Sequence, residues 1–231
     1  MTKYTFCTQS GKAYYCNNIP SFIRDDSSSI IGQLVKHSFE INKEQSDAWE
    51  NQVHELQIRL EQHGIEGDII FEYDIVRLGK RIDVILLIRH MVFSLEFKNG
   101  KTAFVAQDAQ QAEDYALDIK NFHKESENLY VCPILIATNA EPYGKPQSTD
   151  CYSDKQIHLQ RENIETLIPK VVSISDKYLL HLFFLMQRFV YLLAKLYEEP
   201  FQVLLELSLN RFVFGIHKNR FHHKIASINI S

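Results

Sequence analysis

The spacing of hydrophobic residues predicts a helix at the start of the central part of the chain. The hydrophobic residues of this run recur every three or four positions: Trp49, Val53, Leu56 and Leu60. This period is typical of a helix that buries one face. Asn42 and Gln45, where the run begins, have the spacing of a capping box. We therefore predict an amphipathic helix over residues 44–62.

Three runs rich in β-branched and aromatic residues follow, at residues 67–76, 81–88 and 91–98. The breaks between them are short, so we predict three strands in an antiparallel meander. Residues 107–122 return to the helical period, and residues 129–138 are almost entirely apolar. A strand without polar alternation is typical of the middle of a sheet. The predicted order is helix, three strands, helix and strand.

The flanking regions have a different pattern. Residues 1–41 begin with two short predicted strands and continue into a polar loop at residues 25–29, so we predict a β-rich N-terminal extension. After the central part we expect a strand at residues 156–160 and a helix from Asn163 towards Val171. The predicted domains are the extension over residues 1–41, a core over residues 42–172 and a helical C-terminal extension over residues 173–231.

Residues 176–198 combine helical spacing with high hydrophobicity. His181, Gln187 and Arg188 lie inside this run, and polar and charged side chains are costly at the centre of a membrane. We therefore predict a buried helix, or a helix docked on a partner, and no membrane span.

The composition narrows the class of protein. The chain has 231 residues, 45% of them hydrophobic and 23% charged, with a formal net charge of -4. This excludes a disordered or fibrous protein, and the basic surface of a strong non-specific nucleic-acid binder is missing. The four cysteines lie far apart, which argues against structural zinc. The first residues do not resemble a secretory signal, so we expect free thiols and a cytoplasmic location.

Two carboxylates and a lysine in the predicted meander are the candidate catalytic group. Strand alternation places Asp83 with Ile85 on one face of the second strand, and Glu96 with Lys98 on one face of the third. A hairpin that turns near residues 89–90 then sets Asp83 roughly opposite Glu96.

Such a pair favours a divalent cation. Two carboxylates ~4 Å apart repel by about 4 kcal/mol at an effective dielectric of ~20, and a cation removes this penalty. Oxygen ligands on a partly open site suit Mg²⁺ or Mn²⁺, which keep several waters and accept phosphate oxygens. Lys98 would orient or help deprotonate the attacking water and stabilise charge on the phosphate. The group indicates metal-assisted phosphodiester hydrolysis; the alternative is a solvated strand edge with alternating charges.

Gln111 and Tyr115 are a second candidate pair, in the helix that follows the meander. They are four residues apart and therefore lie on one helical face. An amide and a phenol there would grip a nucleic-acid backbone, or position Lys98 and the water. The alternative is that Gln111 is a surface residue and Tyr115 a core residue.

With these residues, the sequence resembles the PD-(D/E)xK nuclease superfamily, whose core is ordered αβββαβ. The matching segments are RID with Asp83, LEFK with Glu96 and Lys98, and QAEDY with Gln111 and Tyr115, which resembles the Gln-x-x-x-Tyr element of the RecB-like branch. Residues 49–138 also resemble the nuclease-like region that precedes a Schlafen-type, superfamily 1 helicase-like ATPase in some bacterial proteins. This similarity covers roughly residues 45–200.

The resemblance implies an α/β fold with a restriction-endonuclease-like αβββαβ core, a central mixed sheet and a helical C-terminal extension. It implies that Asp83 and Glu96 hold Mg²⁺ or Mn²⁺, that Lys98 serves the water, and that Gln111 and Tyr115 support the site. The implied activity is hydrolysis of DNA, in bacterial defence or DNA processing. The sequence leaves open whether the substrate is DNA or RNA, and whether it is single- or double-stranded.

Further acidic residues are candidates for a third metal ligand. In many members of the superfamily a glutamate of the first core helix reaches the metal. Glu50 and Glu55 are both available here, and Glu55 is preferred because it precedes Leu56 on the apolar face; a solvated helix face is the alternative. Glu72 and Asp74 share one face of the first strand by alternation, and we expect that face to be exposed.

Partners follow from the same resemblance. The phosphate-loop pattern GxxxxGK[ST] of the ATPase does not occur in the chain. We therefore expect a stand-alone or truncated nuclease module, or a helicase-like ATPase domain or chain as a separate partner, and a homo-oligomer is also possible. The second hypothesis is a catalytically inactive module that docks on DNA or a helicase-like partner through residues 176–198.

Overall fold

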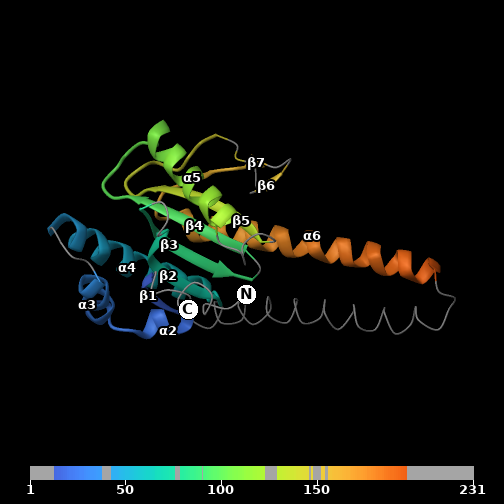
Figure 1. Cartoon of the computed structure of the whole chain (residues 1–231), viewed down its shortest axis with the longest axis horizontal. Helices are drawn as coiled ribbons and strands as arrows, with labels where there is room; N and C mark the ends of the chain where they lie inside the picture. Colours follow the sequence, from blue (N-terminus) through green and yellow to red (C-terminus); the bar gives the residue numbers. More distant parts are fainter. Residues whose placement is uncertain are drawn as a thin grey trace, which may run out of the picture. The chain divides into compact units, whose positions relative to one another are not determined.

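A six-stranded mixed sheet with helices around it forms the body of the protein (Figure 1). The structure is a computed structural model that describes residues 13–37, 43–75, 79–89, 91–122, 129–145, 147, 152–153 and 156–196. The helices are α2 (Ile19–Arg24), α3 (Ser27–His37), α4 (Lys43–His63), α5 (Ala106–Phe122) and α6 (Leu167–Leu196). The strands are β1 (Ala13–Asn18), β2 (Asp68–Ile75), β3 (Lys80–Ile88), β4 (Met91–Lys98), β5 (Tyr130–Ala137), β6 (Tyr152–Ser153), β7 (Gln156–Ile157) and β8 (Gln160–Glu162).

The sheet follows the order β1-β2-β3-β4-β5-β8. Strands β1 to β4 pair antiparallel, because short connections join β2, β3 and β4. Helix α5 connects β4 to β5 and allows these strands to pair parallel, and β8 also pairs parallel with β5. The α/β class and the antiparallel meander are thereby confirmed, and β5 is an interior strand of the sheet although not a central one.

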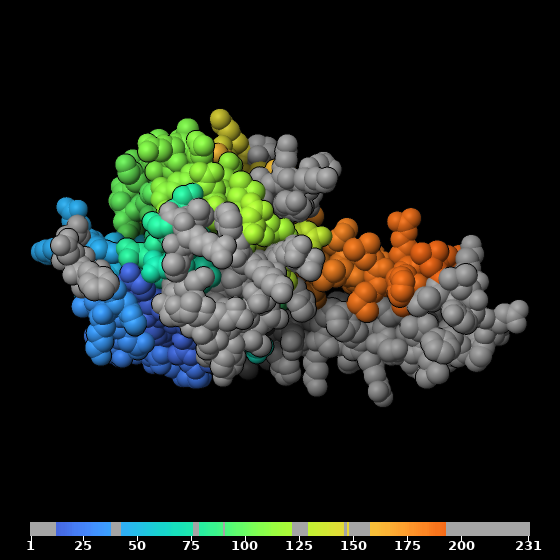
Figure 2. Space-filling model, viewed as in Figure 1, coloured from blue at the N-terminus to red at the C-terminus, as the bar shows by residue number. Residues whose placement is uncertain are grey.

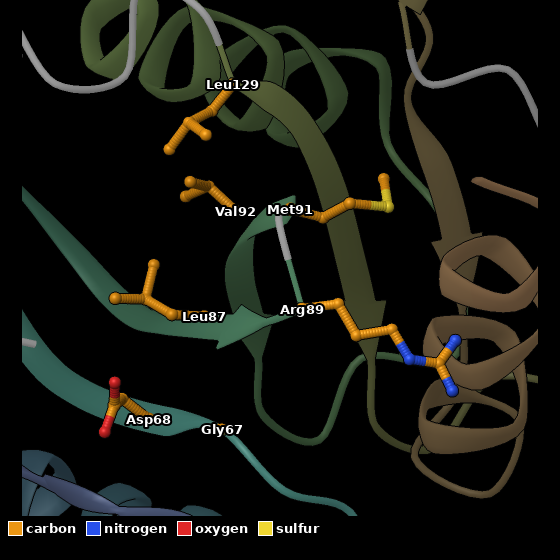
Figure 3. A pocket seen from close by; sticks show the side chains of 7 residues that line it. All are labelled: Gly67, Asp68, Leu87, Arg89, Met91, Val92 and Leu129. Carbon is orange, nitrogen blue, oxygen red and sulfur yellow. The ribbon is translucent and has the colours of Figure 1, made fainter. Parts of the chain in front are cut away.

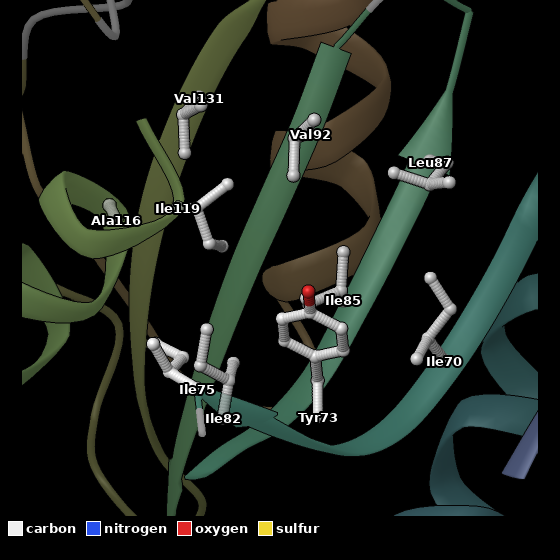
Figure 4. Close-up of a cluster of buried hydrophobic side chains, with 10 residues drawn as sticks. All are labelled: Ile70, Tyr73, Ile75, Ile82, Ile85, Leu87, Val92, Ala116, Ile119 and Val131. Carbon is white, nitrogen blue, oxygen red and sulfur yellow. The ribbon is translucent and has the colours of Figure 1, made fainter. Parts of the chain in front are cut away.

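Strict alternation fails at one place in the meander. The apolar cluster under α5 contains both Ile82 and Ile85 of β3, and both Ile70 and Tyr73 of β2, although residues three apart would lie on opposite faces (Figure 4). Between the β2 residues lies Glu72, whose φ of 53° is in the left-handed region. The alternation of side chains between the two faces of the sheet is therefore shifted by one residue at Glu72 in β2. The same shift occurs in β3 between Ile82 and Ile85.

The described part of the N-terminal region contains helices where the sequence predicted a polar loop. Asn18 caps α2 by accepting a hydrogen bond from the Ser21 N–H (2.8 Å), and Pro20 stands in the first turn, where its missing N–H costs nothing. The following helix, α3, buries Ile30 and Leu34. Of the predicted β-rich extension, β1 is present as an edge strand of the main sheet; residues 1–12 lie outside the described residues.

The region after β5 also differs from the prediction. The expected strand at residues 156–160 is divided between β7 and β8. Instead of separate helical stretches, one helix of 30 residues, α6, runs through the predicted domain boundary. Asn163 precedes it, and its Oδ1 accepts hydrogen bonds from the Glu165 N–H (3.1 Å) and the Thr166 N–H (2.9 Å).

The chain divides into two compact units, residues 1–175 and 176–231. The boundaries predicted at residues 42 and 173 stay predictions. Among the described residues, no helix has the length and hydrophobicity needed to cross a membrane. Free thiols were expected throughout; Cys132 is buried and forms no disulfide, but Cys16 is disulfide-bonded.

Candidate active site at the end of β3 and β4

Asp83 and Glu96 lie opposite each other where the β3–β4 pairing ends. The last paired residues are Val84 and Leu95, and one step further along this register sets Asp83 against Glu96. The Phe97 N–H donates a hydrogen bond to Asp83 Oδ2 (2.8 Å). The Asp83 carboxylate therefore accepts a hydrogen bond from a backbone N–H of β4, and this bond holds Asp83 in place beside Glu96.

A chain of hydrogen bonds leads from Glu96 to helix α5. Lys98 Nζ donates to Glu96 Oε1 (2.9 Å) and to Gln111 Oε1 (3.0 Å), and Gln111 Nε2 donates to the Tyr115 hydroxyl (2.9 Å). Gln111 and Tyr115 are one helical turn apart, so α5 presents both to Lys98. The Tyr115 side chain also packs against the apolar cluster under α5. Tyr115 is thus partly buried against the core and also takes part in the polar chain, and its role towards a nucleic acid or the water stays a prediction.

Helix α5 is held over β4 and β5 by small apolar side chains. Ala112 and Ala116 are buried, as is Ile119. The other side of the helix forms part of the protein surface, shown in light green in Figure 2. The alanines let α5 approach the sheet closely enough for Gln111 to reach Lys98 across the end of β4.

The two carboxylates are in an environment that disfavours their charge. Glu96 is only 4% exposed; burial, and next the negative charge of Asp83, raise its pKa well above the ordinary value. Burial also raises the pKa of Asp83, while the Phe97 N–H and the charge of Lys98 oppose that rise. The pair therefore shares a site in which protein groups alone leave the second negative charge poorly compensated.

Lys98 is a cation in this environment. Burial acts to lower its pKa, but the hydrogen bond to Glu96 and the charges of Glu96 and Asp108 outweigh burial and raise it. The Asp108 Oδ1 lies 3.6 Å from Nζ. With only protein groups around it, Lys98 is therefore a hydrogen-bond donor and a positive charge, and proton abstraction from water is the less suitable of its two predicted roles.

The donor set of the pair fits Mg²⁺ or Mn²⁺. Glu96 Oε2 is buried and has no hydrogen-bond partner among the described residues. Such an oxygen is costly without a partner, and hard divalent cations prefer carboxylate oxygens. Asp83 and Glu96 are the two protein ligands that this arrangement offers; within the described ranges there is no group of three or more His, Cys, Asp or Glu side chains placed to hold a metal.

The structure does not bring the first-helix glutamates to this pair. Glu55, on α4, forms an ion pair with Arg59 one turn further along the helix. It lines a pocket together with Phe97, whose side chain points away from the Glu96 side of β4. Glu50 is exposed.

Sequence reasoning missed the role of Glu72. The register of β2 and β3 sets it level with Asp83, so three carboxylates lie in a row on neighbouring strands. Glu72 is 4% exposed, not on an open face as expected. Its Oε1 accepts a hydrogen bond from Trp49 Nε1 (2.7 Å), and its Oε2 pairs with Arg81 Nε. Burial, followed by the charge of Asp83, raises the pKa of Glu72 to about 7.

The signal for Glu72 in the sequence was too weak to use. Its burial depends on the left-handed φ that turns its side chain towards Trp49, and a strand pattern gives no sign of this. Arg81 completes the group, because its Nη1 donates to the Tyr14 hydroxyl (2.8 Å) of β1. Glu72 therefore binds both Trp49 and Arg81, and its ion pair with Arg81 connects β2 to β3, the strand that carries Asp83.

Two pockets lie near opposite ends of the meander. One, of about 140 Å³, opens beside the β3–β4 turn and is lined mainly by apolar side chains such as Leu87 and Met91 (Figure 3). The Arg89 side chain extends from there to Ser175, where Nη1 donates to Oγ (3.2 Å). The other, of about 290 Å³, lies at the end of β4 that carries Lys98.

Comparison with known proteins places the chain in no family. No family model matches it, and no curated protein matches it. One match among solved structures is protein VC1899 from Vibrio cholerae, with 11% sequence identity and a TM-score of 0.30 over 64% of this chain. The chain spans 42% of the length of that protein. A likeness this weak does not establish a common fold.

Proposed function

We propose that the protein is a metal-dependent nuclease of the PD-(D/E)xK type, RecB-like branch, that hydrolyses DNA phosphodiester bonds on a restriction-endonuclease-like αβββαβ core. The observation that carries the proposal is the state of Glu96. One oxygen receives Lys98, and the other is buried without a hydrogen-bond partner among the described residues, beside the carboxylate of Asp83. This is the arrangement expected of a carboxylate that awaits a cation.

Each residue of the group has a role in this proposal. Asp83 and Glu96 hold Mg²⁺ or Mn²⁺; the ion, when bound, neutralises phosphate charge and lowers the pKa of water. Lys98 donates hydrogen bonds, so it orients the water and stabilises negative charge on the phosphate. Gln111 fixes Lys98, and Tyr115 fixes Gln111. These are the residues of the RID, LEFK and QAEDY segments that carry the resemblance to the superfamily.

Few of the described lysine and arginine side chains near the site are available to contact a phosphate. Arg81 is committed to Glu72 and Tyr14, and Lys80 pairs with Asp118 (3.1 Å). Lys101, three residues beyond the end of β4, is exposed. Because the whole chain is acidic, DNA would be held at the site mainly by the bound cation together with Lys98 and Lys101.

Cleavage assays with a matched pair of lysine variants test the proposal. The full chain is incubated with plasmid and with single-stranded DNA in Mg²⁺, Mn²⁺ or chelator. We expect metal-dependent cleavage that Lys98→Ala lowers on the order of 10³-fold, equivalent to ~4 kcal/mol of transition-state stabilisation. Lys36→Ala, at an exposed position of α3 outside the candidate site, is the control and keeps the parent rate. Equal rates for the parent and Lys98→Ala would remove Lys98 from the mechanism.

A second candidate function rests on the exposed apolar side chains of α6. Residues at least 48% exposed are Leu180, Phe184, Leu185, Met186, Phe189, Tyr191 and Leu192. An apolar surface of this kind is typical of a protein–protein contact. It favours a non-catalytic module that docks on a helicase-like ATPase chain. A protein that neither cleaves DNA nor gains thermal stability from Mn²⁺, with Asp83 and Glu96 intact, would favour this function.

A further inference from the structure

Asp108 faces Lys98 from helix α5 and has no assigned role in the proposed hydrolysis. It lies in the first turn of the helix, three residues before Gln111, so helical spacing sets the two side chains on one face. Its Oδ1 lies 3.6 Å from Lys98 Nζ, and Gln111 Oε1 accepts a hydrogen bond from the same nitrogen (3.0 Å). Helix α5 therefore contacts the Lys98 ammonium at two points, one charged and one neutral.

The distance between Asp108 and Lys98 leaves one hydrogen of the ammonium available. A lysine ammonium has three N–H donors. Among the described residues, Glu96 and Gln111 are the acceptors at hydrogen-bond distance, and 3.6 Å is too long for a hydrogen bond to Asp108. Asp108 therefore supplies a negative charge without taking up the third donor. This donor is the one that a water or a phosphate oxygen would use.

Both partners of this ion pair are partly shielded from water. The Lys98 and Asp108 side chains are each 19% exposed. An ion pair in such surroundings is screened less by solvent and salt than a pair on the open surface. The carboxylate of Asp108 is therefore close enough, and sufficiently shielded, to hold the ammonium in place by its charge.

Glu96 has two tasks in the proposed mechanism, and they compete. It accepts a hydrogen bond from Lys98 through Oε1, and its Oε2 is the proposed metal-binding atom. With a dication on Oε2, Glu96 offers Lys98 less negative charge, and the ammonium lies close to a like charge that repels it. Lys98 then needs a second negative charge that is not a metal ligand. Asp108 is suited to this task, because in the described part of the chain it forms no metal-binding group with Asp83 and Glu96.

We propose that Asp108 is a positioning residue that keeps Lys98 directed at the reacting phosphate while Glu96 binds the cation. This inference rests on the proposed nuclease function and adds a residue to its mechanism. Asp108 supplies the counter-charge, Gln111 supplies the acceptor that sets the direction of Nζ, and the third N–H stays available for the substrate. The alternative is a carboxylate that stabilises α5 through the charge at its N-terminus, and such a role would affect the stability of the fold alone.

Steady-state cleavage of DNA in saturating Mn²⁺ separates the two roles. Asp108→Asn removes the charge and keeps the size of the side chain. We expect kcat to fall about tenfold with KM close to the parent value, because the variant still binds DNA but holds Lys98 poorly. In the Lys98→Met background the same substitution should have no further effect. Glu113→Gln, which removes a carboxylate from another side of α5, is the control and keeps the parent kcat.

Melting in chelator tests the contact without metal and without cleavage. Asp108→Asn should lower the melting temperature of the parent by more than that of Lys98→Met, since part of the loss is the ion pair with Lys98. The effect of the charge on the end of the helix is the same in both backgrounds and cancels in this comparison. If Lys98→Met does not fold, Lys98→Gln takes its place.

Two results would overturn the inference. The first is a parent-like kcat for Asp108→Asn, or an equal loss of kcat with and without Lys98. The second is an equal loss of melting temperature in both backgrounds. Each of them leaves Lys98-dependent cleavage by the parent intact, so the proposed nuclease function would stand. A parent that does not cleave DNA in Mn²⁺ overturns both proposals, and coupled melting would then retain only the contact between Asp108 and Lys98.

Discussion

At the scale of single residues, the two oxygens of Glu96 have different surroundings. Oε1 is bound by Lys98, and Oε2 is buried without a partner among the described residues. The nearby charge of Asp83 adds to the effect of burial, so the folded protein resists full ionisation of the pair. A cation bound to the pair would relieve both costs at once, and this links the electrostatics to the proposed chemistry.

The variant Glu96→Gln tests this link without a cleavage assay. The amide keeps the shape of the side chain but removes the negative charge. We expect Mn²⁺ to raise the melting temperature of the parent and to have no effect on the variant. In chelator at pH 8 the variant should melt at or above the parent temperature, because burial disfavours the Glu96 charge. An equal Mn²⁺ shift in both proteins would show that the cation binds elsewhere.

Glu72 predicts a pH dependence of stability. Its folded-state pKa of about 7 lies above the ordinary 4.5, so the folded protein binds this proton more tightly than the unfolded chain does. The resulting stabilisation is fully present below pH 4.5 and is lost as the pH rises through 7, by up to about 3 kcal/mol. Glu72→Gln should lack this loss.

Chemical denaturation at pH 5 and pH 8.5 measures the difference. Stability should fall more for the parent than for Glu72→Gln between these two values. At pH 5 the Glu72 side chain of the folded parent is protonated and resembles the amide of the variant, whereas at pH 8.5 it is charged, so the slope of stability with pH is the quantity to compare. Parallel profiles would mean that Glu72 keeps an ordinary pKa.

At the scale of elements, Asp83 joins two strands where their ladder ends. Its carboxylate accepts the Phe97 N–H, so the residue is structural as well as a candidate ligand. The two functions respond differently to substitution. An amide preserves the acceptor, whereas an alanine preserves neither function.

Comparison of Asp83→Asn with Asp83→Ala separates these functions. The alanine leaves the Phe97 N–H without its partner and should lower the free energy of unfolding by ~1–3 kcal/mol. The asparagine should fold with nearly parent stability in urea denaturation, and both variants should lose the Mn²⁺ shift. If alanine and asparagine are equally stable, the Phe97 hydrogen bond contributes nothing measurable.

The same elements show what could be predicted from the sequence. The spacing of hydrophobic residues along the chain predicted α4, β2 to β5 and α5, because local patterns determine these elements. The short turn between two strands predicted that Asp83 would lie opposite Glu96. The i to i+4 spacing placed Gln111 and Tyr115 on one face.

The rest depended on contacts between distant segments. The left-handed φ of Glu72 and its bond to Trp49 are tertiary features, and no strand pattern predicts them. The apolar faces of α2 and α3 are short, and the capping residues of these helices lie among other polar residues. The sequence of this region therefore predicted a polar loop. The Arg59 partner of Glu55 was visible at i+4, but helix spacing alone did not show that the two side chains would form an ion pair.

At the scale of the whole molecule, most of the exposed large apolar side chains among the described residues lie on α6. Phe184 and Phe189 are 62% and 63% exposed, and both lie in the second compact unit, residues 176–231. The candidate site lies wholly in the first unit. Its chemistry should therefore be independent of these side chains.

The double variant Phe184→Glu, Phe189→Glu checks this independence. Substitutions at exposed positions change stability by about 0.5 kcal/mol or less. We expect unchanged melting and unchanged cleavage, with weaker self-association in sedimentation. A large loss of stability would mean that these side chains are covered in solution.

The central claim is that Asp83 and Glu96 hold the cation that hydrolyses a phosphodiester. The most direct test is the rate of single-stranded DNA cleavage in Mn²⁺ by the purified parent and Glu96→Gln, each repeated in chelator. The account predicts cleavage by the parent in Mn²⁺ only, and a rate on the order of 10³-fold lower for the variant. Cleavage by Glu96→Gln at the parent rate would contradict it.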